Sequence, residues 1–229
     1  LANNSDVNIK GLIMKGATGK GIAGFNYTGA LSIFEANIHM SDCSFSNNFS
    51  EDALNLINVN GLVEKLKIFD TPSDGLDVDF GKLEIRDSLF SNIGSQTGAD
   101  AVDISHSTVK MSNIKIFKTT DKGLSIGESA QVDVDGMEVR NALVGLAIKD
   151  SSLMKAKNIK LSGISLADVM AYNKKPHYEG ASVYVENLDS EKSQFLNQKG
   201  SIMHINGINI EPRTINIDSL YESLMQSIK

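Results

Sequence analysis

The chain has 229 residues, 41% of them hydrophobic, which is enough to bury the core of one large domain or two small ones. Its 22 Lys and Arg residues against 28 Asp and Glu give a net charge of -6, and no basic cluster stands out. Because nucleic-acid binding depends on cations that neutralise phosphates, this balance argues against a nucleic-acid partner. No apolar run approaches the ~18 residues that a membrane-spanning helix needs, and residues 1–20 do not resemble a signal peptide.

The N-terminal part of the chain enters a strand pattern at once, without a starting methionine, so we expect the chain to be part of a longer protein. Cys43 is the only cysteine, which excludes an intrachain disulfide and a cysteine-based metal site. The alternation of polar and apolar residues around it predicts a buried, unreactive thiol.

A repeat of about 22 residues then runs along the chain. Each copy is a small residue followed by an apolar–variable–apolar triplet, and the copies begin at Ala30, Ala53, Gly75, Ala101, Gly123 and Gly145, with a weaker seventh, VMAY, at Val169. Successive copies are 23, 22, 26, 22, 22 and 24 residues apart, and an insertion at 95–98 (SQTG) accounts for the spacing of 26. A second alternating stretch follows in each copy, from NIHMSDCSF after the first to SVYVENL after the last.

This pattern predicts stacked parallel strands. Alternation with period two indicates strands with one buried face, and the joining residues lack the two-residue turns of hairpins. A fixed period fits strands that pair in parallel with their equivalents one rung away, with a small residue where the backbone bends. The recurring Asn of leucine-rich repeats is missing, and a β-sandwich has no reason for a fixed register. We therefore predict an all-β fold, a right-handed parallel β-helix (solenoid) with coils of about 22 residues.

The last sixteen residues, TINIDSLYESLMQSIK, read as a strand followed by a short helix. Ser219 and Glu222 have the spacing of a capping box. Apolar residues recur on one face of this helix, at Leu220, Leu224 and Ile228. We predict a β-helix domain over residues 1–217 and a C-terminal helix over 218–229 that either caps the core or docks onto another chain or domain.

The register of the repeat places a run of aspartates on the outside of the coil. In GLDVD the apolar residues point inward, so Asp77 and Asp79 point outward. Rungs lie ~4.8 Å apart, so acidic residues one repeat apart become neighbours. The expected stacks are Asp77 with Asp103, and Asp52 with Asp74 and Asp100. Carboxylates at that distance repel by ~0.9 kcal/mol in water, which solvent exposure, a bound cation or a raised pKa can relieve.

Three interpretations of these aspartates stay open. They form a solvated polar surface, a weak contact for a cation or sugar, or an acid/base pair like that of glycosidases. For Ca²⁺ the candidates are Asp77, Asp79 and Asp103, although side chains on a flat sheet supply few of the six to eight oxygens that this ion prefers, and no other cofactor is indicated. The catalytic candidates are Asp74, Asp77, Asp79, Asp103 and His106.

The stretch 172–180, YNKKPHYEG, is the longest departure from the repeat. It is either a loop that interrupts the coil or a loop that contacts carbohydrate. In the second case the candidate substrate-binding residues are Tyr172, Lys174, Lys175, His177 and Tyr178. The chain has no Trp and 6% aromatic residues, which argues against a surface that grips sugars mainly by ring stacking.

The rungs DALNL, SDGLDVDFGKLEIRDSLFSNIG, ADAVDIS, KGLSIGE and LVGLAIKDSS, with the loop AYNKKPHY, resemble the right-handed β-helix repeat domains of the pectin-lyase-like superfamily. They are most similar to those of bacterial spore-coat-kinase-like (CotH-type) surface proteins. The resemblance covers about residues 28–190 and concerns the fold. A polygalacturonase-like site would need Asp-Asp, Gly-His-Gly and Arg-x-Lys, which are absent, and neither Arg86 nor Arg140 stands in a lyase-like motif. The resemblance therefore implies no catalytic residue.

The favoured expectation is a non-catalytic module of a secreted or surface bacterial protein, extracellular or at the cell surface. It would bind polysaccharide or neighbouring domains of its parent protein. Two alternatives stay open: a polysaccharide lyase, hydrolase or epimerase that uses the outward aspartates, and an oligomeric fibre segment.

Overall fold

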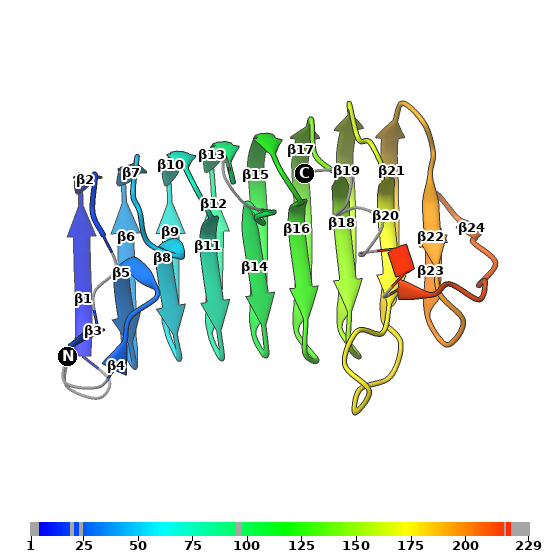
Figure 1. Ribbon diagram of the computed structural model, residues 1–229, viewed down its shortest axis with the longest axis horizontal. Helices are drawn as coiled ribbons and strands as arrows, with labels where there is room; N and C mark the ends of the chain where they lie inside the picture. The colour runs from blue at the N-terminus through cyan, green and yellow to red at the C-terminus, as the bar shows by residue number, and fades with distance from the viewer. Residues whose placement is uncertain (1–4, 19–20, 23–24, 95–97, 218, 221–229) are drawn as a thin grey trace.

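The chain winds into a parallel β-helix whose rungs stack along the long axis of the molecule (Figure 1). The structure is a computed structural model that describes residues 5–18, 21–22, 25–94, 98–217 and 219–220. Its strands form two large sheets and one small hairpin. The predicted all-β parallel solenoid is confirmed.

The first large sheet has eight strands that stand side by side in the order of the sequence. They are β5 (Gly29–Phe34), β8 (Asp52–Ile57), β11 (Asp74–Asp79), β14 (Val102–Ser105), β16 (Lys122–Gly127), β18 (Val144–Lys149), β20 (Ala167–Tyr172) and β22 (Phe195–Asn197). This sheet, called here the front sheet, carries the repeated triplets.

The second large sheet has fourteen strands and is called here the back sheet. Its main path is β1 (Ser5–Lys10), β6 (Ala36–Ser41), β9 (Asn60–Glu64), β12 (Lys82–Arg86), β15 (Thr108–Thr119), β17 (Gln131–Arg140), β19 (Leu153–Ser162), β21 (Ser182–Ser190), β23 (Ile202–Ile205) and β24 (Ile208–Asn209). Beside it pair β2 (Ile13–Lys15), β7 (Ser44–Ser46), β10 (Lys67–Thr71) and β13 (Leu89–Ile93), while β3 (Gly21–Ile22) and β4 (Phe25–Asn26) form the hairpin.

The strand register reproduces the sequence repeat with one correction. One inward column of the front sheet consists of Leu31, Leu54, Leu76, Val102, Leu124, Leu146, Val169 and Phe195, so paired residues are 23, 22, 26, 22, 22, 23 and 26 positions apart. Val169 pairs with Leu146, so the seventh copy begins at Asp168, one residue earlier than predicted. Of the insertion predicted at 95–98, residues 95–97 lie outside the described residues.

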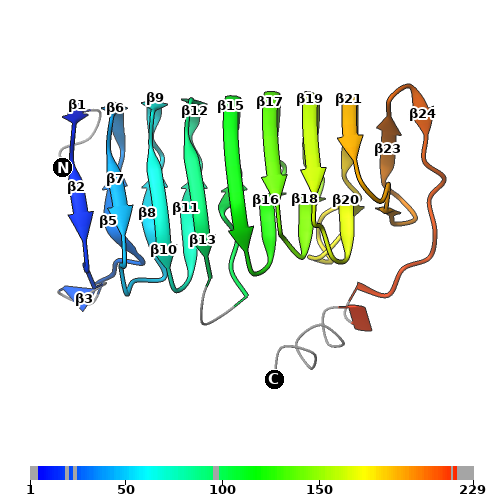
Figure 2. The same cartoon turned by 90° about the horizontal axis from the view of Figure 1, so that it is seen from above.

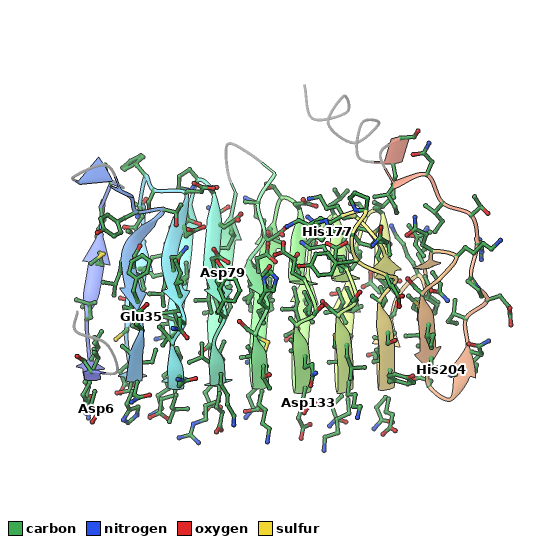
Figure 3. All side chains as sticks on the ribbon, turned by 90° about the horizontal axis from the view of Figure 1, so that it is seen from below. Asp6, Glu35, Asp79, Asp133, His177 and His204 are labelled. Atoms are coloured by element: carbon green, nitrogen blue, oxygen red, sulfur yellow. The ribbon has the colours of Figure 1, made fainter. Side chains whose placement is uncertain are left out.

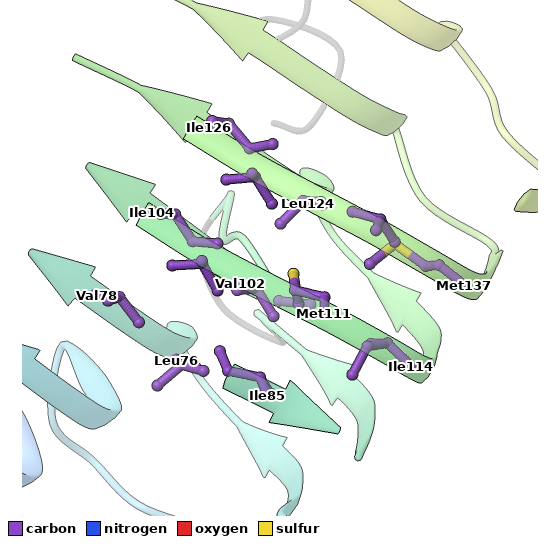
Figure 4. Close-up of a cluster of buried hydrophobic side chains, with 14 of the residues drawn as sticks. Leu76, Val78, Ile85, Val102, Ile104, Met111, Ile114, Leu124, Ile126 and Met137 are labelled. Atoms are coloured by element: carbon purple, nitrogen blue, oxygen red, sulfur yellow. The ribbon is translucent and has the colours of Figure 1, made fainter. Parts of the chain in front are cut away.

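The core lies between the two sheets, where inward apolar side chains meet. In Figure 4, Leu76 and Val102 of the front sheet face Ile85 and Met111 of the back sheet, and all four are buried. The small residue at the corner is required by close packing, because a Cβ on Gly75 would lie 2.4 Å from the carbonyl oxygen of Ala101. Cys43 is buried and free, as predicted.

The outer face of the front sheet changes character along the molecule. Its central outward column reads Ser32, Asn55, Asp77, Asp103, Ser125, Ala147, Met170 and Leu196, polar at first and apolar at the end. The chain after β24 crosses to this side (Figure 2), and Ile217 packs with Ala147 and Met170 in a second apolar cluster. The described part of the tail therefore packs on the apolar rungs.

The described part of the C-terminal helix differs from the prediction at its start. Ile217, Ser219 and Leu220 are helical, and the side-chain oxygen of Asn216 accepts the backbone N–H of Ser219 at 3.0 Å. Asn216 is thus the N-cap in place of Ser219. Glu222 and the rest of the predicted helix lie outside the described residues. Over the described ranges, no helix is both long and apolar enough to cross a membrane.

Candidate functional site

The polar rungs of the front sheet carry a cluster of outward acidic side chains, called here the aspartate face. Its members are Asp52, Asn55, Asp74, Asp77, Asp79, Asp100 and Asp103. Asp77 pairs with Asn55 on one side and Asp103 on the other, and the backbone N–H of Asp100 donates to Asp74 Oδ1 at 2.9 Å. Both predicted stacks are therefore formed.

Burial keeps the central carboxyls of this face from ionising easily. Removal from water, followed by the charge of Asp79, raises the pKa of Asp77 to about 9. Removal from water, followed by the charge of Asp100, raises the pKa of Asp74 to about 7. Desolvation likewise raises the pKa of Asp52 and of Asp79. The crowded carboxyl groups thus retain protons to higher pH than an ordinary aspartate, and Asp77, with a pKa of about 9, holds its proton at neutral pH.

Asn55 joins the two acidic stacks. Its side-chain amide donates to Asp52 Oδ2 and Asp77 Oδ2, both at 3.1 Å, and to Thr28 Oγ1 at 2.8 Å. Asn55 Oδ1 and Asp103 Oδ1 are buried, and neither has a hydrogen-bond partner in the part of the chain that the structure describes. Since buried acceptors are usually satisfied, these two oxygens are exceptions to the normal hydrogen bonding of a protein interior.

Two buried lysines supply positive charge at the edge of the aspartate face. Lys122 Nζ lies 3.2 Å from Asp100 Oδ1 and 2.5 Å from Asp121 Oδ2. Lys149 Nζ donates to Ser125 Oγ at 2.8 Å and lies 3.8 Å from Asp103 Oδ1. Asp103 therefore has a cation beside it, whereas Asp77 forms no ion pair with any of the residues that the structure describes.

The loop 173–180 folds over the end of this face. The backbone N–H groups of Lys174 and Lys175 donate to Asp150 Oδ1 at 2.7 and 2.8 Å, and Lys175 forms an ion pair with Glu128. Burial and the neighbouring charge of Lys149 lower the pKa of Lys174, so its amine reaches the same cluster. This loop is a wall of the site, because it is anchored to two rungs of the front sheet.

The structure brings most of the predicted site residues together on this side of the coil, where Asp79 and His177 lie (Figure 3). The residues that meet there are Asp74, Asp77, Asp79, Asp103, His106, Lys174, Lys175 and Tyr178. Tyr172 requires a correction: its ring is fully buried under the tail and cannot contact a substrate. His177 is exposed and packs on Tyr178 at 4.5 Å between ring centroids.

Four further residues of this site were not predicted from the sequence: Phe80, Lys122, Glu128 and Lys149. The repeat contains a signal for one of them, since Lys122 continues the column of Asp52, Asp74 and Asp100. The reach of Lys149 across a rung has no such signal.

The aspartate face shows no metal-binding geometry. Among the described residues, no group of three or more His, Cys, Asp or Glu side chains could hold a metal ion. The charges of Asp100 and Asp103 are instead faced by lysine ammonium groups.

A second polar feature lies on the back sheet, on the side of Asp133 and His204 in Figure 3. It is a furrow of about 800 Å³ between two rows of outward side chains. Its lining includes Glu84, Lys110, Asp133, Lys155, Lys157 and Tyr184. It shares no residue with the aspartate face.

Comparison with known proteins adds little beyond the architecture. No model of a known protein family matches the chain, and no curated protein matches it. Among solved structures, the chain is similar to the catalytic unit of a thermostable GH87 α-1,3-glucanase from Streptomyces thermodiastaticus strain HF3-3, with 11% sequence identity and a TM-score of 0.35. The match covers 76% of this chain and 50% of that chain, so this chain spans about half the length of the glucanase unit. A likeness this distant says nothing about chemistry.

Proposed function

We propose that this protein cleaves a polysaccharide by acid–base catalysis at the aspartate face, with Asp77 as the proton donor. The observation that carries the proposal is the contrast between two paired residues. Asp77 has its pKa raised to about 9, whereas Asp103, its neighbour on the next rung, lies 3.8 Å from the ammonium group of Lys149. Two adjacent carboxyl groups with different environments are the arrangement that acid–base enzymes use.

The roles follow from these environments. The carboxylic acid of Asp77 gives its proton to the glycosidic oxygen as the bond to the anomeric carbon breaks. The carboxylate of Asp103, balanced by Lys149, accepts a proton from the water that attacks this carbon or attacks it directly. One rung is ~4.8 Å, near the separation of about 5–5.5 Å between the carboxyls of retaining glycosidases.

The shape of the site favours a polymer over a small sugar. The aspartate face extends over three successive rungs and is bounded at one end by loop 173–180 and the C-terminal tail. An extended chain can lie along such a row of polar side chains. Because polysaccharides of this kind are met outside the cell, we propose an extracellular or cell-surface location.

The test is turnover of a panel of plant and bacterial polysaccharides, followed as new reducing ends. We expect Asp77→Asn to lower turnover by about 10²–10⁴-fold, the usual contribution of a general acid. Asp133→Asn on the back sheet is the matched control and should keep wild-type turnover. A wild-type rate in Asp77→Asn would exclude Asp77 as the donor.

A second candidate function is a non-catalytic module that binds polysaccharide. The furrow on the back sheet favours it, because rows of charged side chains there run along the molecule at rung spacing. In this case affinity gels would retain the protein without turnover. Lys110→Met together with Lys155→Met would abolish that retention, while Asp77→Asn would leave it unchanged.

A further inference from the structure

Six strands of the front sheet, β5 to β18, are each followed directly by a residue with positive φ. These residues form a row at the edge of the aspartate face: Glu35 (φ 50°), Asn58 (54°), Phe80 (55°), His106 (51°), Glu128 (58°) and Asp150 (56°). The left-handed region is unfavourable for bulky side chains, and strain of this kind persists where the surrounding structure enforces it. Phe80 is the one apolar residue in this row.

Phe80 is also largely exposed to solvent, with 56% of its surface accessible. Burial in the core therefore does not explain an aromatic residue at a strained position. Phe80 directly follows Asp79, so its ring stands at the border of the aspartate face.

The ring of Phe80 is held in place by a stack. It lies on the imidazole of His106, with 4.6 Å between centroids and 16° between planes. His106 is in turn fixed at both ring nitrogens: Nε2 lies 2.9 Å from the hydroxyl of Tyr178, and Nδ1 lies 3.1 Å from Glu128 Oε2. A rigid aromatic surface loses little conformational entropy when a ligand binds.

We propose that Phe80, supported by His106, is a stacking platform for one pyranose ring of a polysaccharide and thereby positions the next glycosidic bond over the aspartate face. An aromatic ring is electron-rich on its face and attracts the weakly positive C–H groups that one side of a pyranose presents. The hydroxyl groups at the rim of that sugar meet polar partners in Glu128 and Tyr178. The ligand class is therefore a polymer of pyranoses whose substituents are mostly equatorial, which leaves one C–H face open.

This inference has two parts, stacking of a sugar on Phe80 and placement of the glycosidic bond over Asp77. The second part deepens the proposed function and rests on it. The first half, sugar stacking on Phe80, can be tested without any turnover. The chain contains no Trp, so Phe80→Trp introduces a single tryptophan, whose emission can be excited apart from that of the tyrosines. The probes are cellohexaose, xylohexaose, β-1,4-mannohexaose and hexagalacturonic acid. Phe69→Trp is the matched control, since Phe69 is 37% exposed on strand β10 of the back sheet.

We expect at least one probe to shift the emission of the Phe80→Trp variant in a saturable way and to leave the Phe69→Trp variant unchanged. Phe80→Ala should weaken binding of that probe by about two- to tenfold, from the 0.5–1.5 kcal/mol of an aromatic contact. Phe80→Tyr should restore binding, because it keeps the ring. With a cleaved polymer, Phe80→Ala should raise KM and change kcat little.

The outcomes separate the two proposals. A saturable response without turnover of any polymer supports the platform and contradicts the acid–base function. The platform is overturned, and the acid–base function is supported, if turnover depends on Asp77 while no probe changes the emission of Phe80→Trp and Phe80→Ala has a wild-type KM. Silence with all four probes and no turnover overturns both.

Discussion

Lys149 on strand β18 reaches back over strand β16 to Asp103 on strand β14, with its ammonium group 3.8 Å from Asp103 Oδ1. The path is open because residue 127, which lies between them on β16, is glycine. A Cβ on Gly127 would lie 2.7 Å from Cε of Lys149. The ion pair between Lys149 and Asp103 thus depends on the absence of a side chain at Gly127.

Gly127→Ala should therefore impair the site and spare the fold. The added Cβ meets a flexible side chain, so Lys149 moves aside and leaves Asp103. We expect turnover to fall at least about tenfold, which corresponds to ~1.4 kcal/mol, since a charge pair about 4 Å apart interacts by about 4 kcal/mol at an effective dielectric constant near 20. The midpoint of urea unfolding should change little.

Gly123→Ala is the contrast: its Cβ would lie 2.6 Å from Val139 Cγ1 and 2.7 Å from the carbonyl oxygen of Gly145, so we expect a loss of about 1–3 kcal/mol in unfolding free energy. Equal effects of both variants on stability would contradict this account.

The raised pKa of Asp77 predicts how stability depends on pH. In the unfolded chain an Asp titrates near 4, whereas Asp77 in the folded protein titrates at about 9 among Asp52, Asp74, Asp79 and Asp103. Between these values the folded state binds more protons than the unfolded state, so stability falls as pH rises from about 4 to 9. Asp77→Asn removes this titration. Its melting temperature should exceed that of the wild type by a few degrees at pH 8 and match it at pH 4. A wild-type melting curve at both pH values would show that Asp77 ionises normally.

Lys122 is predicted to stabilise the fold by pairing with the buried carboxylate of Asp100 and the half-buried carboxylate of Asp121. Lys122→Met leaves Asp100 and Asp121 without their shared cation, and removal of one partner from a buried ion pair costs about 3–5 kcal/mol. The loss should be smaller at pH 5 than at pH 8, because desolvation raises the pKa of Asp121 and a lower pH therefore favours its neutral form. Chemical unfolding at pH 5 and 8 measures both values. Lys110→Met, at an exposed position, is the control and should stay within about 0.5 kcal/mol of wild type.

The C-terminal tail is predicted to be part of the folded unit. Ile217 is 7% exposed and packs with Ala147 and Met170, so Ile217→Ala should cost about 2 kcal/mol, at the low end of core truncations. Limited proteolysis should then cut more quickly after β24, because the tail opens more often. Ile208→Ala, at a position 65% exposed, should change neither readout. Unaltered proteolysis of Ile217→Ala would show that the tail is not held by this contact.

The sequence was sufficient for the architecture because a β-helix repeats one local rule many times. The inward triplets, the rung spacing and the stacking of Asp77 on Asp103 all follow from alternation and a constant period. The same rule failed at the seventh copy, where a small residue is missing at the corner and Asp168 stands in its place.

The site was only partly predictable, since its decisive contacts do not follow the repeat. Lys149 crosses a rung diagonally, and the loop 173–180 returns over rungs that precede it by more than forty residues, as the bond between Tyr178 and His106 shows. Phe80 was overlooked because, in the alternating pattern, it reads as one more turn residue. Burial of Tyr172 depends on the tail, whose packing position is not encoded in any local pattern.

The central claim is that Asp77 keeps its proton at neutral pH while its neighbours on the aspartate face supply charge. The most direct measurement is NMR titration of the carboxyl carbons in protein labelled with ¹³C-aspartate, with Asp77→Asn to assign the signal. The account predicts that the signal lost in Asp77→Asn titrates above pH 7, close to 9. A midpoint near 4, the value of an ordinary aspartate, would contradict it and leave the aspartate face as a solvated surface.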